Sequence, residues 1–189
     1  MSWSSEIAAD SPLVWWRQDD TSGTTMTDSS GNSRPGTWAS TPAQSQTSLI
    51  ASDSNFACDY STDYADVTYG SWMNASTITL MAVYKPNTAP GATELIAARY
   101  PSTSANQVFQ FRRNAAGQAE FIWKNTGGTI RTVTGTSTLA SGTAYLIHGT
   151  VDSSGNGRIY VNGTLEATLS PGDCLGIRTS NVSTGIRVG

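Results

Sequence analysis

The sequence predicts an all-β fold in which two antiparallel sheets stack as a sandwich or jelly roll. Short runs of β-branched and aromatic residues recur along the 189-residue chain, and clusters of Gly, Asn, Ser and Pro separate them. No segment shows the sustained 3.6-residue apolar period of a long helix. We therefore expect no helix longer than about two turns. A closed barrel is the alternative arrangement of the same strands.

About eleven strand-like runs follow one another along the chain. In order, they are residues 12–17, 56–60, 64–69, 76–86, 94–99, 108–113, 119–124, 129–134, 144–151, 158–163 and 185–189. The run VFQFRR has the clearest alternation, with Phe109 and Phe111 on one face and Gln110 and Arg112 on the other. Such alternation is typical of a half-buried antiparallel strand.

The pentapeptide DSSGN occurs twice, at residues 28–32 and 152–156. The second copy separates the runs AYLIHGTV and RIYV, and its Ser, Gly and Asn residues suit a short hairpin loop. Immediately afterwards, Asn162-Gly163 fits the two central positions of a type I′ turn. We therefore expect residues 144–168 to form a three-stranded meander.

Composition excludes several classes of protein. Charged residues make up 13% of the chain, the formal net charge is −3 and neither sign forms a run, so we expect no nucleic-acid partner. No apolar stretch approaches the roughly 20 residues that span a bilayer, so we expect no membrane insertion. The two cysteines, Cys58 and Cys174, are too few for a disulfide framework; we expect free thiols, with a single bridge as the alternative.

The acidic residues argue against catalysis. Glycoside hydrolysis needs two carboxyl groups about 5 to 9.5 Å apart, which a strand supplies at alternating positions. Three of the four glutamates, Glu94, Glu120 and Glu166, have no other acidic residue two or four positions away, and the fourth, Glu6, has only Asp10, which lies outside the strand-like runs. The one histidine, His148, lies in a strand-like run without a G-x-S-x-G motif, and one His with two distant Cys does not make a zinc site. We expect a protein that is not an enzyme.

Four segments together resemble the laminin G-like branch of the concanavalin A-like lectin/glucanase superfamily. They are SPLVWWRQDDTSGTTMTDSSGNSRPGTW, STITLMAVYKP, AYLIHGTVDSSGNGRIYVNGTLEATL and GIRVG. The resemblance implies a concanavalin A-like jelly-roll sandwich of two antiparallel sheets. Its core would be filled by residues such as Trp15, Phe56, Ile78, Leu80, Phe121, Ile147 and Tyr160. Members of this superfamily bind glycans or proteins, or hydrolyse glycans, so the resemblance implies no particular reaction.

The start of the chain resembles a second group of proteins. Its pattern E-I-x-A-D-S-P-x-x-x-W-R is similar to the N-termini of minor tail proteins from phages of actinobacteria. This implies a virion tail protein, assembled in the host cytoplasm, with other tail proteins as partners and a homo-oligomeric or multi-copy arrangement. We expect an N-terminal arm at residues 1–11 and a laminin G-like domain at residues 12–189.

The first DSSGN copy predicts a metal site. It lies in a polar segment with two further acidic residues, and Ca²⁺ prefers oxygen ligands of the kind that this segment offers. In the resembled family such a loop helps to hold a structural calcium. Asp28 is the first candidate ligand, followed by Asp19, Asp20 and Asn32. The alternative is a plain Asx turn.

Two classes of function follow. The first is a non-enzymatic structural or adhesion module of a phage tail, whose partner at the host surface would be a glycan. The alternative is a carbohydrate-binding module of a secreted or enzyme-attached protein. Glycans dock on exposed aromatic faces beside polar groups, and Trp3, Trp38 and Trp72 lie next to turn residues, although packing is the default role of each.

The last strand-like run ends the sequence at Gly189. In the resembled family one more strand follows and pairs beside the first strand. Since an unpaired edge invites aggregation, we expect that the polypeptide continues beyond this sequence or that a neighbouring subunit covers the edge.

Overall fold

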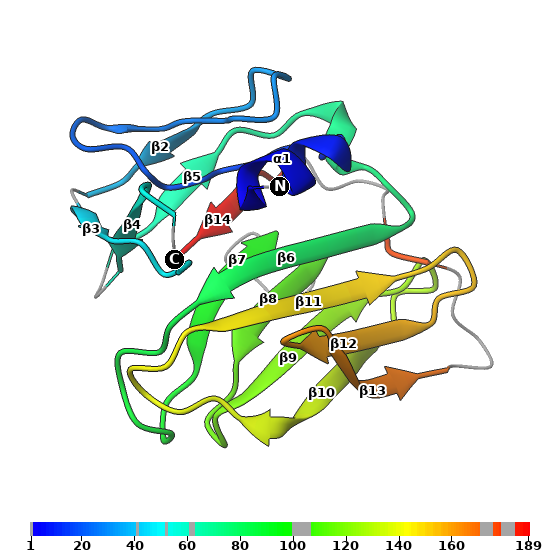
Figure 1. Cartoon of the computed structure of the whole chain (residues 1–189). Coiled ribbons are helices and arrows are strands. Elements are labelled where there is room, and N and C mark those ends of the chain that lie inside the picture. The colour runs from blue at the N-terminus through cyan, green and yellow to red at the C-terminus, as the bar shows by residue number, and fades with distance from the viewer. Residues whose placement is uncertain are drawn as a thin grey trace. The chain divides into compact units, whose positions relative to one another are not determined.

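A computed structural model shows an all-β protein (Figure 1). It describes residues 2–40, 42–51, 53–60, 63–99, 107–170, 176–178 and 184–189. The chain divides into two compact units, Met1–Thr68 with Gly189, and Tyr69–Val188. Within the described ranges no helix is long and apolar enough to cross a membrane.

The first unit holds a short helix and five short strands. These elements are α1 (Trp3–Ala9), β1 (Thr25–Met26), β2 (Gly36–Trp38), β3 (Ala43–Thr47), β4 (Phe56–Asp59) and β5 (Ala65–Val67). Helix α1 begins where Ser2 and Ser5 cap each other, each side chain accepting a hydrogen bond from the other's backbone N–H. Antiparallel ladders join β1 to β2, β2 to β5, and β3 to β4.

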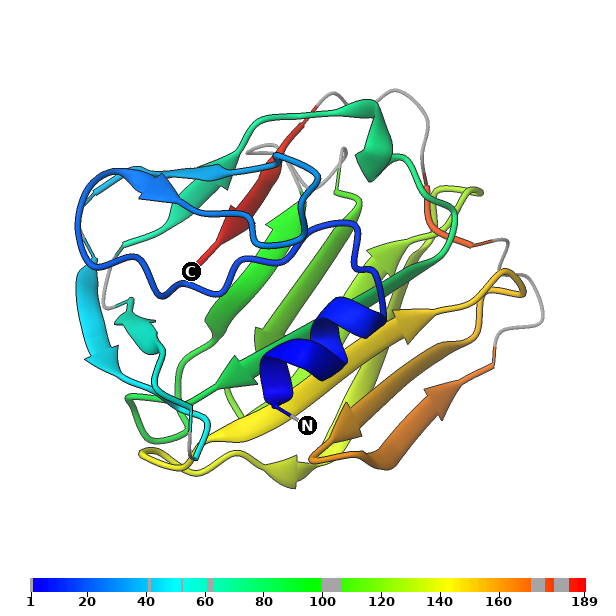
Figure 2. The same ribbon diagram turned by 45° about the horizontal axis from the view of Figure 1, so that its top comes forward.

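The second unit is the sandwich that the sequence predicts. Its elements are η1 (Ser71–Met73), β6 (Ile78–Tyr84), β7 (Glu94–Arg99), β8 (Phe109–Arg113), β9 (Gln118–Lys124), β10 (Ile130–Thr138), β11 (Tyr145–Val151), β12 (Gly157–Val161), β13 (Thr164–Leu169) and β14 (Ile186–Val188). One layer runs in the order β13-β12-β11-β6, and the other in the order β14-β7-β8-β9-β10. Figures 1 and 2 show the two layers stacked face to face.

Aromatic residues of β8 and β9 fill the core between these layers. Phe111 and Phe121 meet edge to face with ring centroids 6.0 Å apart, and Phe121 stacks on Trp123 at 5.8 Å. The opposite layer carries glycines where these rings press on it. A Cβ on Gly149 would lie 3.0 Å from Phe121, and one on Gly157 would overlap the Trp123 ring. The alternation of small and large residues across the layers therefore keeps the packing tight.

The meander is confirmed. Strand β12 pairs with β11 through Ile147↔Val161 and with β13 through Val161↔Thr164. Asn162 and Gly163 connect β12 to β13 with φ angles of 49° and 81°, as a type I′ turn requires. The alternation in β8 is confirmed as well, since Phe109 and Phe111 are buried.

Two expectations about particular segments are wrong. Residues 12–17 form no strand and contribute only an isolated bridge, Trp16↔Asp28. Side chains of the first DSSGN loop, rather than a partner strand, bond the backbone of this segment. Phe56 is not a core residue: it is 43% exposed, because it opens β4 in a two-stranded sheet.

The other expected core residues divide into two groups. Phe121 and Ile147 are fully buried, as predicted. Four more are only half-buried: Trp15, Ile78, Leu80 and Tyr160. Cys58 is a free thiol, as predicted. Cys174 lies outside the described residues, so for Cys174 the free thiol stays a prediction.

Candidate functional site

The first DSSGN loop is organised around one carboxylate. Asp28 Oδ1 accepts hydrogen bonds from the backbone N–H groups of Trp15 (3.0 Å) and Ser30 (2.9 Å). Asp28 Oδ2 accepts from the Ser30 hydroxyl (2.9 Å) and from the backbone N–H of Arg34 (2.9 Å). Partial burial by itself would raise the pKa of the Asp28 carboxyl, but these hydrogen bonds outweigh it and hold the pKa below its ordinary value.

Further hydrogen bonds fasten this loop to the segment before it. Asn32 Nδ2 donates to the carbonyl oxygens of Pro12 (3.3 Å) and Leu13 (3.1 Å), and Arg34 Nη1 donates to Leu13 (2.6 Å). In return, Trp16 Nε1 donates to the Arg34 carbonyl at 2.9 Å. The two polypeptide segments therefore hold each other in place without regular strand pairing.

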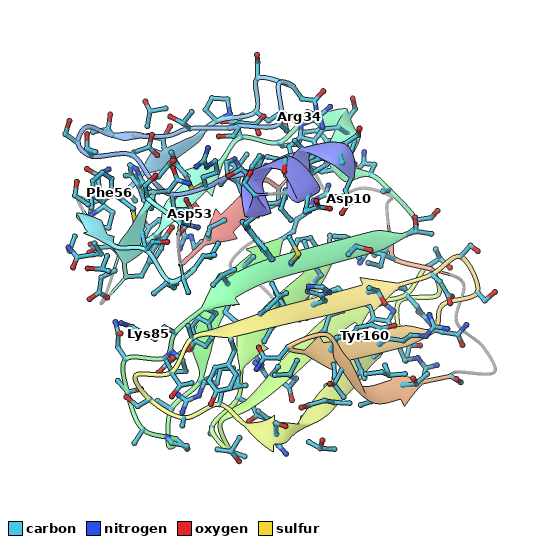
Figure 3. The ribbon with its side chains drawn as sticks, viewed as in Figure 1. Asp10, Arg34, Asp53, Phe56, Lys85 and Tyr160 are labelled. Atoms are coloured by element: carbon cyan, nitrogen blue, oxygen red, sulfur yellow. The ribbon has the colours of Figure 1, made fainter. Side chains whose placement is uncertain are left out.

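A surface hollow of about 330 Å³ lies where these segments meet, and we name it the Trp15 hollow. Its lining combines apolar side chains with hydroxyl and amide groups: Ala8, Ser11, Pro12, Leu13, Trp15, Ser29, Ser30 and Asn32. The Arg17 guanidinium lies 5.3 Å from the centroid of the Trp15 ring and steadies its orientation. Figure 3 labels Arg34, which bonds Leu13 of the lining.

The four predicted metal ligands have different surroundings. Both oxygens of Asp28 already accept two hydrogen bonds each. Asp20 accepts from the backbone and hydroxyl of Thr27, and Asp19 pairs with Arg17 at 3.2 Å. Asn32 directs its amide nitrogen at carbonyl groups.

This arrangement supplies few free oxygens for a cation. Among the described residues, no group of three or more His, Cys, Asp or Glu side chains is placed to hold a metal ion. A calcium ion at Asp28 would have to displace N–H and O–H donors from the carboxylate. The calcium site stays a prediction, which melting curves in CaCl₂ and in EDTA would test, because an ion that binds only the folded chain raises its melting temperature.

Asp19 and Asp20 influence a different group, the thiol of Cys58. Burial is the largest cause that raises the pKa of this thiol to about 11, and the negative charges of Asp20 and Asp19 raise it further. Cys58 Sγ donates to the carbonyl oxygen of Gln18 at 3.3 Å. Cys58 is therefore a protonated, weakly reactive thiol at neutral pH.

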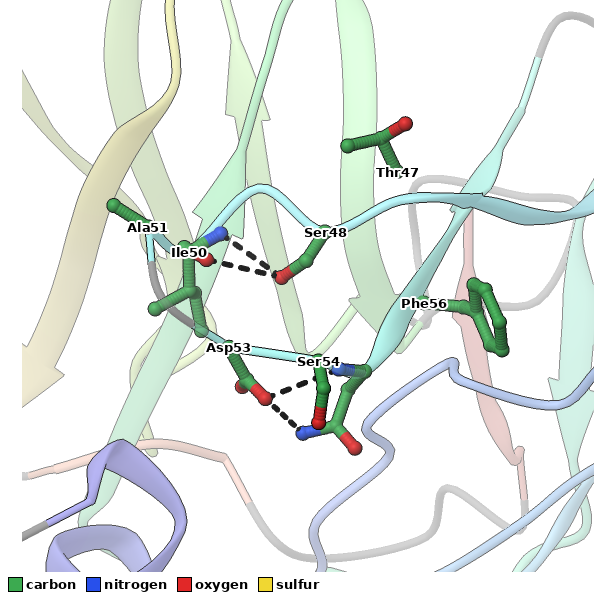
Figure 4. Close-up of a pocket in the computed structure, with 8 residues that line it drawn as sticks. Thr47, Ser48, Ile50, Ala51, Asp53, Ser54 and Phe56 are labelled. Carbon is green, nitrogen blue, oxygen red and sulfur yellow. Dashed lines mark hydrogen bonds between the residues drawn. The ribbon is translucent and has the colours of Figure 1, made fainter.

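A second hollow lies at the connection between β3 and β4 (Figure 4). We name it the β3–β4 hollow; its volume is about 430 Å³. It is lined by Thr47, Ser48, Ile50, Ala51, Asp53, Ser54, Asn55 and Phe56. It shares no lining residue with the Trp15 hollow. Figure 3 labels Asp53 and Phe56 in this part of the first unit.

The groups considered for catalysis have structural contacts. Glu120 pairs with Arg112 at 2.5 Å and Glu94 with the buried Arg113 at 3.0 Å. Glu166 accepts hydrogen bonds from two backbone N–H groups of β10. His148 lies on β11 beside Tyr160, with ring centroids 6.2 Å apart, and burial lowers its pKa.

Sequence reasoning placed Trp15 and Phe56 in the core and did not single out Leu13 or Ser29. Leu13 is 57% exposed, which no periodicity in the sequence indicates. The stretch SDSN before β4 could have predicted the loop at this position, because Asp followed two residues later by Asn is typical of an Asx turn.

The fold and the Trp15 hollow define a β-sandwich protein with a polar, aromatic-lined surface site. A family model described as the concanavalin A-like lectin/glucanases superfamily, Laminin_G_3, matches residues 59–185, well over half of the chain. The chain belongs to this superfamily. A search of curated protein sequences finds no significant match.

Solved structures share the fold at low identity. One is the CBM40 domain of the Ruminococcus gnavus IT-sialidase bound to α2,3-sialyllactose, with a TM-score of 0.52, 17% identity and coverage of 65% of this chain and 71% of that chain. Another is a botulinum neurotoxin type C structure, from work in which cell entry depends on interaction with two ganglioside molecules; its TM-score is 0.62 at 15% identity. That match covers 97% of this chain and 44% of the toxin chain. These likenesses concern the fold alone.

Proposed function

We propose that this chain is a non-catalytic glycan-binding module and that its ligand docks in the Trp15 hollow. The observation that carries the proposal is the lining of the hollow, where an indole ring and aliphatic groups stand beside three serines and an amide. A sugar presents an apolar C–H face and a ring of hydroxyls, and both find partners in such a lining.

The polar groups of the hollow are available for this role. None of the hydrogen bonds that the structure describes uses Oδ1 of Asn32 or the hydroxyl of Ser29. Because Asp28 and Asn32 already fix the backbone around the hollow, little ordering is needed on binding. The structural neighbours include a domain bound to sialyllactose, which supports a glycan as the ligand class.

The absence of catalysis is part of the proposal. It is supported by the ion pairs of Glu94 and Glu120 and by the backbone contacts of Glu166, which occupy these carboxylates with structural roles. Incubation with the oligosaccharides that the protein binds, followed by product analysis, should show no cleavage.

We also propose that the module belongs to a phage tail, where it occurs in several copies beside other tail proteins and contacts a glycan of the host surface. The N-terminal pattern E-I-x-A-D-S-P-x-x-x-W-R supports this setting. Mass spectrometry of purified virions tests it, because a tail protein copurifies with particles. Recovery of the chain only as a secreted or enzyme-attached polypeptide would favour the alternative, a carbohydrate-binding module outside a virion.

The glycan-binding proposal is tested with an oligosaccharide array followed by calorimetric titration of each ligand found. Trp15→Ala should weaken binding at the Trp15 hollow at least tenfold, whereas Trp72→Ala should not. Trp72 is a matched control because it lies in η1 and lines neither hollow. If the array shows no bound sugar, or if both variants bind like the unmodified chain, the proposal is wrong.

A further inference from the structure

The β3–β4 hollow has the features of a binding site that is independent of the Trp15 hollow. Two pairs of its lining residues are joined by hydrogen bonds (Figure 4). Ser48 Oγ accepts from the backbone N–H of Ile50 at 3.1 Å and donates to the Ile50 carbonyl at 3.3 Å. Asp53 Oδ1 accepts from the backbone N–H of Asn55 at 3.1 Å and also from Asn55 Nδ2.

These bonds leave one acceptor oxygen on each of the two side chains. The described hydrogen bonds of this pair use Asp53 Oδ1 and the two nitrogens of Asn55, and none of them uses Asp53 Oδ2 or Asn55 Oδ1. The bond between the two side chains fixes their spacing. Acceptor oxygens that line a hollow suit a ligand with hydroxyl donors, such as a sugar.

Phe56 supplies an apolar surface in the same hollow. It is one of the few large apolar side chains of the described residues that remain exposed, at 43%, and it lines the hollow together with Ile50 and Ala51. The hollow is therefore lined by an exposed aromatic residue and by acceptor oxygens, and a sugar's C–H face and hydroxyls need both kinds of group.

The charge of the hollow narrows the class of ligand. Asp53 is the charged residue among those that line it. A carboxylate attracts hydroxyl donors but repels the carboxylate of an acidic sugar, because like charges a few ångströms apart disfavour each other even near the surface. The ligand class therefore differs from the sialylated ligand of the structural neighbour.

We infer that the β3–β4 hollow is a second glycan site, which takes an uncharged, hydroxyl-rich sugar through Asp53, Asn55 and Phe56 and disfavours acidic sugars. This inference rests on the proposed function, because it assumes that the module binds glycans, but it concerns a different set of residues. The consequence is a module with two sites, of which one is selective for neutral sugars.

The test is calorimetric titration with a neutral oligosaccharide from the array and with the same oligosaccharide carrying a terminal sialic acid. The unmodified chain should bind two neutral ligands, whereas Trp15→Ala and Phe56→Ala should each bind one. Leu165→Ala is the matched control for Phe56, because Leu165 is 49% exposed on β13 and lines neither hollow. Circular dichroism spectra and melting temperatures verify that each variant is folded.

The charge argument is tested in the Trp15→Ala background, where only the β3–β4 hollow is left. There the neutral ligand should bind at least fivefold more tightly than its sialylated form, and Asp53→Asn should remove most of this preference. Asp10→Asn removes the same charge at the exposed C-cap of α1 and should leave the preference unchanged.

The outcomes separate the two proposals. If Trp15→Ala abolishes all binding and Phe56→Ala leaves stoichiometry and affinity unchanged, the second site is excluded and the proposed function stands. If the Trp15→Ala chain binds both ligands equally, the selectivity is wrong. If the unmodified chain binds no oligosaccharide, the proposed function fails and the second site fails with it.

Discussion

The two DSSGN loops have the same five residues, but their aspartates bond different parts of the chain. Asp28 collects donors from Trp15, Ser30 and Arg34, and so joins segments that are 13 residues apart in the sequence. Asp152 collects all its donors from the next six residues: Ser154 N–H, Asn156 N–H and Nδ2, and Arg158 Nη1.

The difference shows how one motif can serve as a local turn or as a tertiary anchor. Asp152 closes a hairpin between two strands that already pair, so its contacts add to a ladder that exists without it. Asp28 faces a segment with almost no ladder, so the side chain takes the place of the missing strand partner. The neighbouring chain therefore decides what the aspartate does.

The largest effect is expected from Asp28→Ala. This change leaves the backbone N–H groups of Trp15 and Arg34 without their acceptor, and we expect the free energy of unfolding to fall by roughly 3 kcal/mol. Binding at the Trp15 hollow should be lost as well. Urea denaturation followed by tryptophan fluorescence measures the first effect.

The matched change Asp152→Ala should lower the melting temperature much less. The Asp152 side chain is 36% exposed, so the groups that donate to it can bond water instead.

If Asp152→Ala were as damaging as Asp28→Ala, the distinction between anchor and local turn would be wrong. Asp28→Asn, which keeps one acceptor oxygen, should fall between the unmodified chain and Asp28→Ala.

Acid should lower the stability that both DSSGN aspartates contribute to the fold. Hydrogen bonds led by the Asn156 side chain lower the pKa of Asp152 from 3.8 to about 2, and the pKa of Asp28 is lowered too. A carboxyl with a depressed folded-state pKa stabilises the fold above its unfolded-state pKa, and this contribution is lost as the pH falls through the folded-state value. The melting temperature should therefore decline between about pH 4 and pH 2.

Replacing either aspartate with asparagine should make this decline shallower, since the substituted side chain no longer titrates. Melting curves at intervals from pH 7 to pH 2 measure it. A profile that both variants leave unchanged would show that other carboxyl groups control the acid transition.

Near the second loop, Gly163→Val should destabilise the chain by roughly 1 kcal/mol or more, because a β-branched residue resists a φ of 81°. Gly163→Asn is the control, since Asn tolerates this conformation better. A Cβ at this position meets no neighbouring atom, so the expected cost comes from backbone conformation alone. Equal melting temperatures for the two variants would contradict the turn type.

The smallest difference is expected between the two DSSGN glycines. Gly31 and Gly155 have φ angles of 84° and 78°, so alanine at either position should cost about the same, roughly 1 kcal/mol. Differential scanning calorimetry of Gly31→Ala and Gly155→Ala compares them. A large difference between the melting temperatures of the two variants would show that the cost of a Cβ at these glycines, and not only the aspartate contacts, depends on the tertiary setting.

Much of the second unit could be predicted because its signals are local. The alternation of Phe109 and Phe111 and the Asn162-Gly163 turn depend on residues adjacent in the sequence, and the structure confirms them. The strand prediction for residues 12–17 was wrong because the contacts of this segment are not local. Its apolar residues read as a strand, but its backbone groups are bonded by Asp28 and Asn32 side chains, which no local pattern reveals.

The candidate sites show the same limit. The sequence indicated a polar loop at residues 28–32 but not that Trp15, Leu13 and Asn32 would line one hollow, because their proximity depends on hydrogen bonds across 13 to 21 residues. Phe56 had the pattern of a core residue and is exposed.

By itself, the sequence determined the all-β class, the meander and its turns, because alternation, glycine conformation and short-range hydrogen bonds act between near neighbours. Only the tertiary structure decided which aspartate became an anchor and which aromatic side chains reached the surface. Those outcomes depend on which distant groups compete for the same hydrogen bonds and the same buried space, and that competition is settled only when the segments meet.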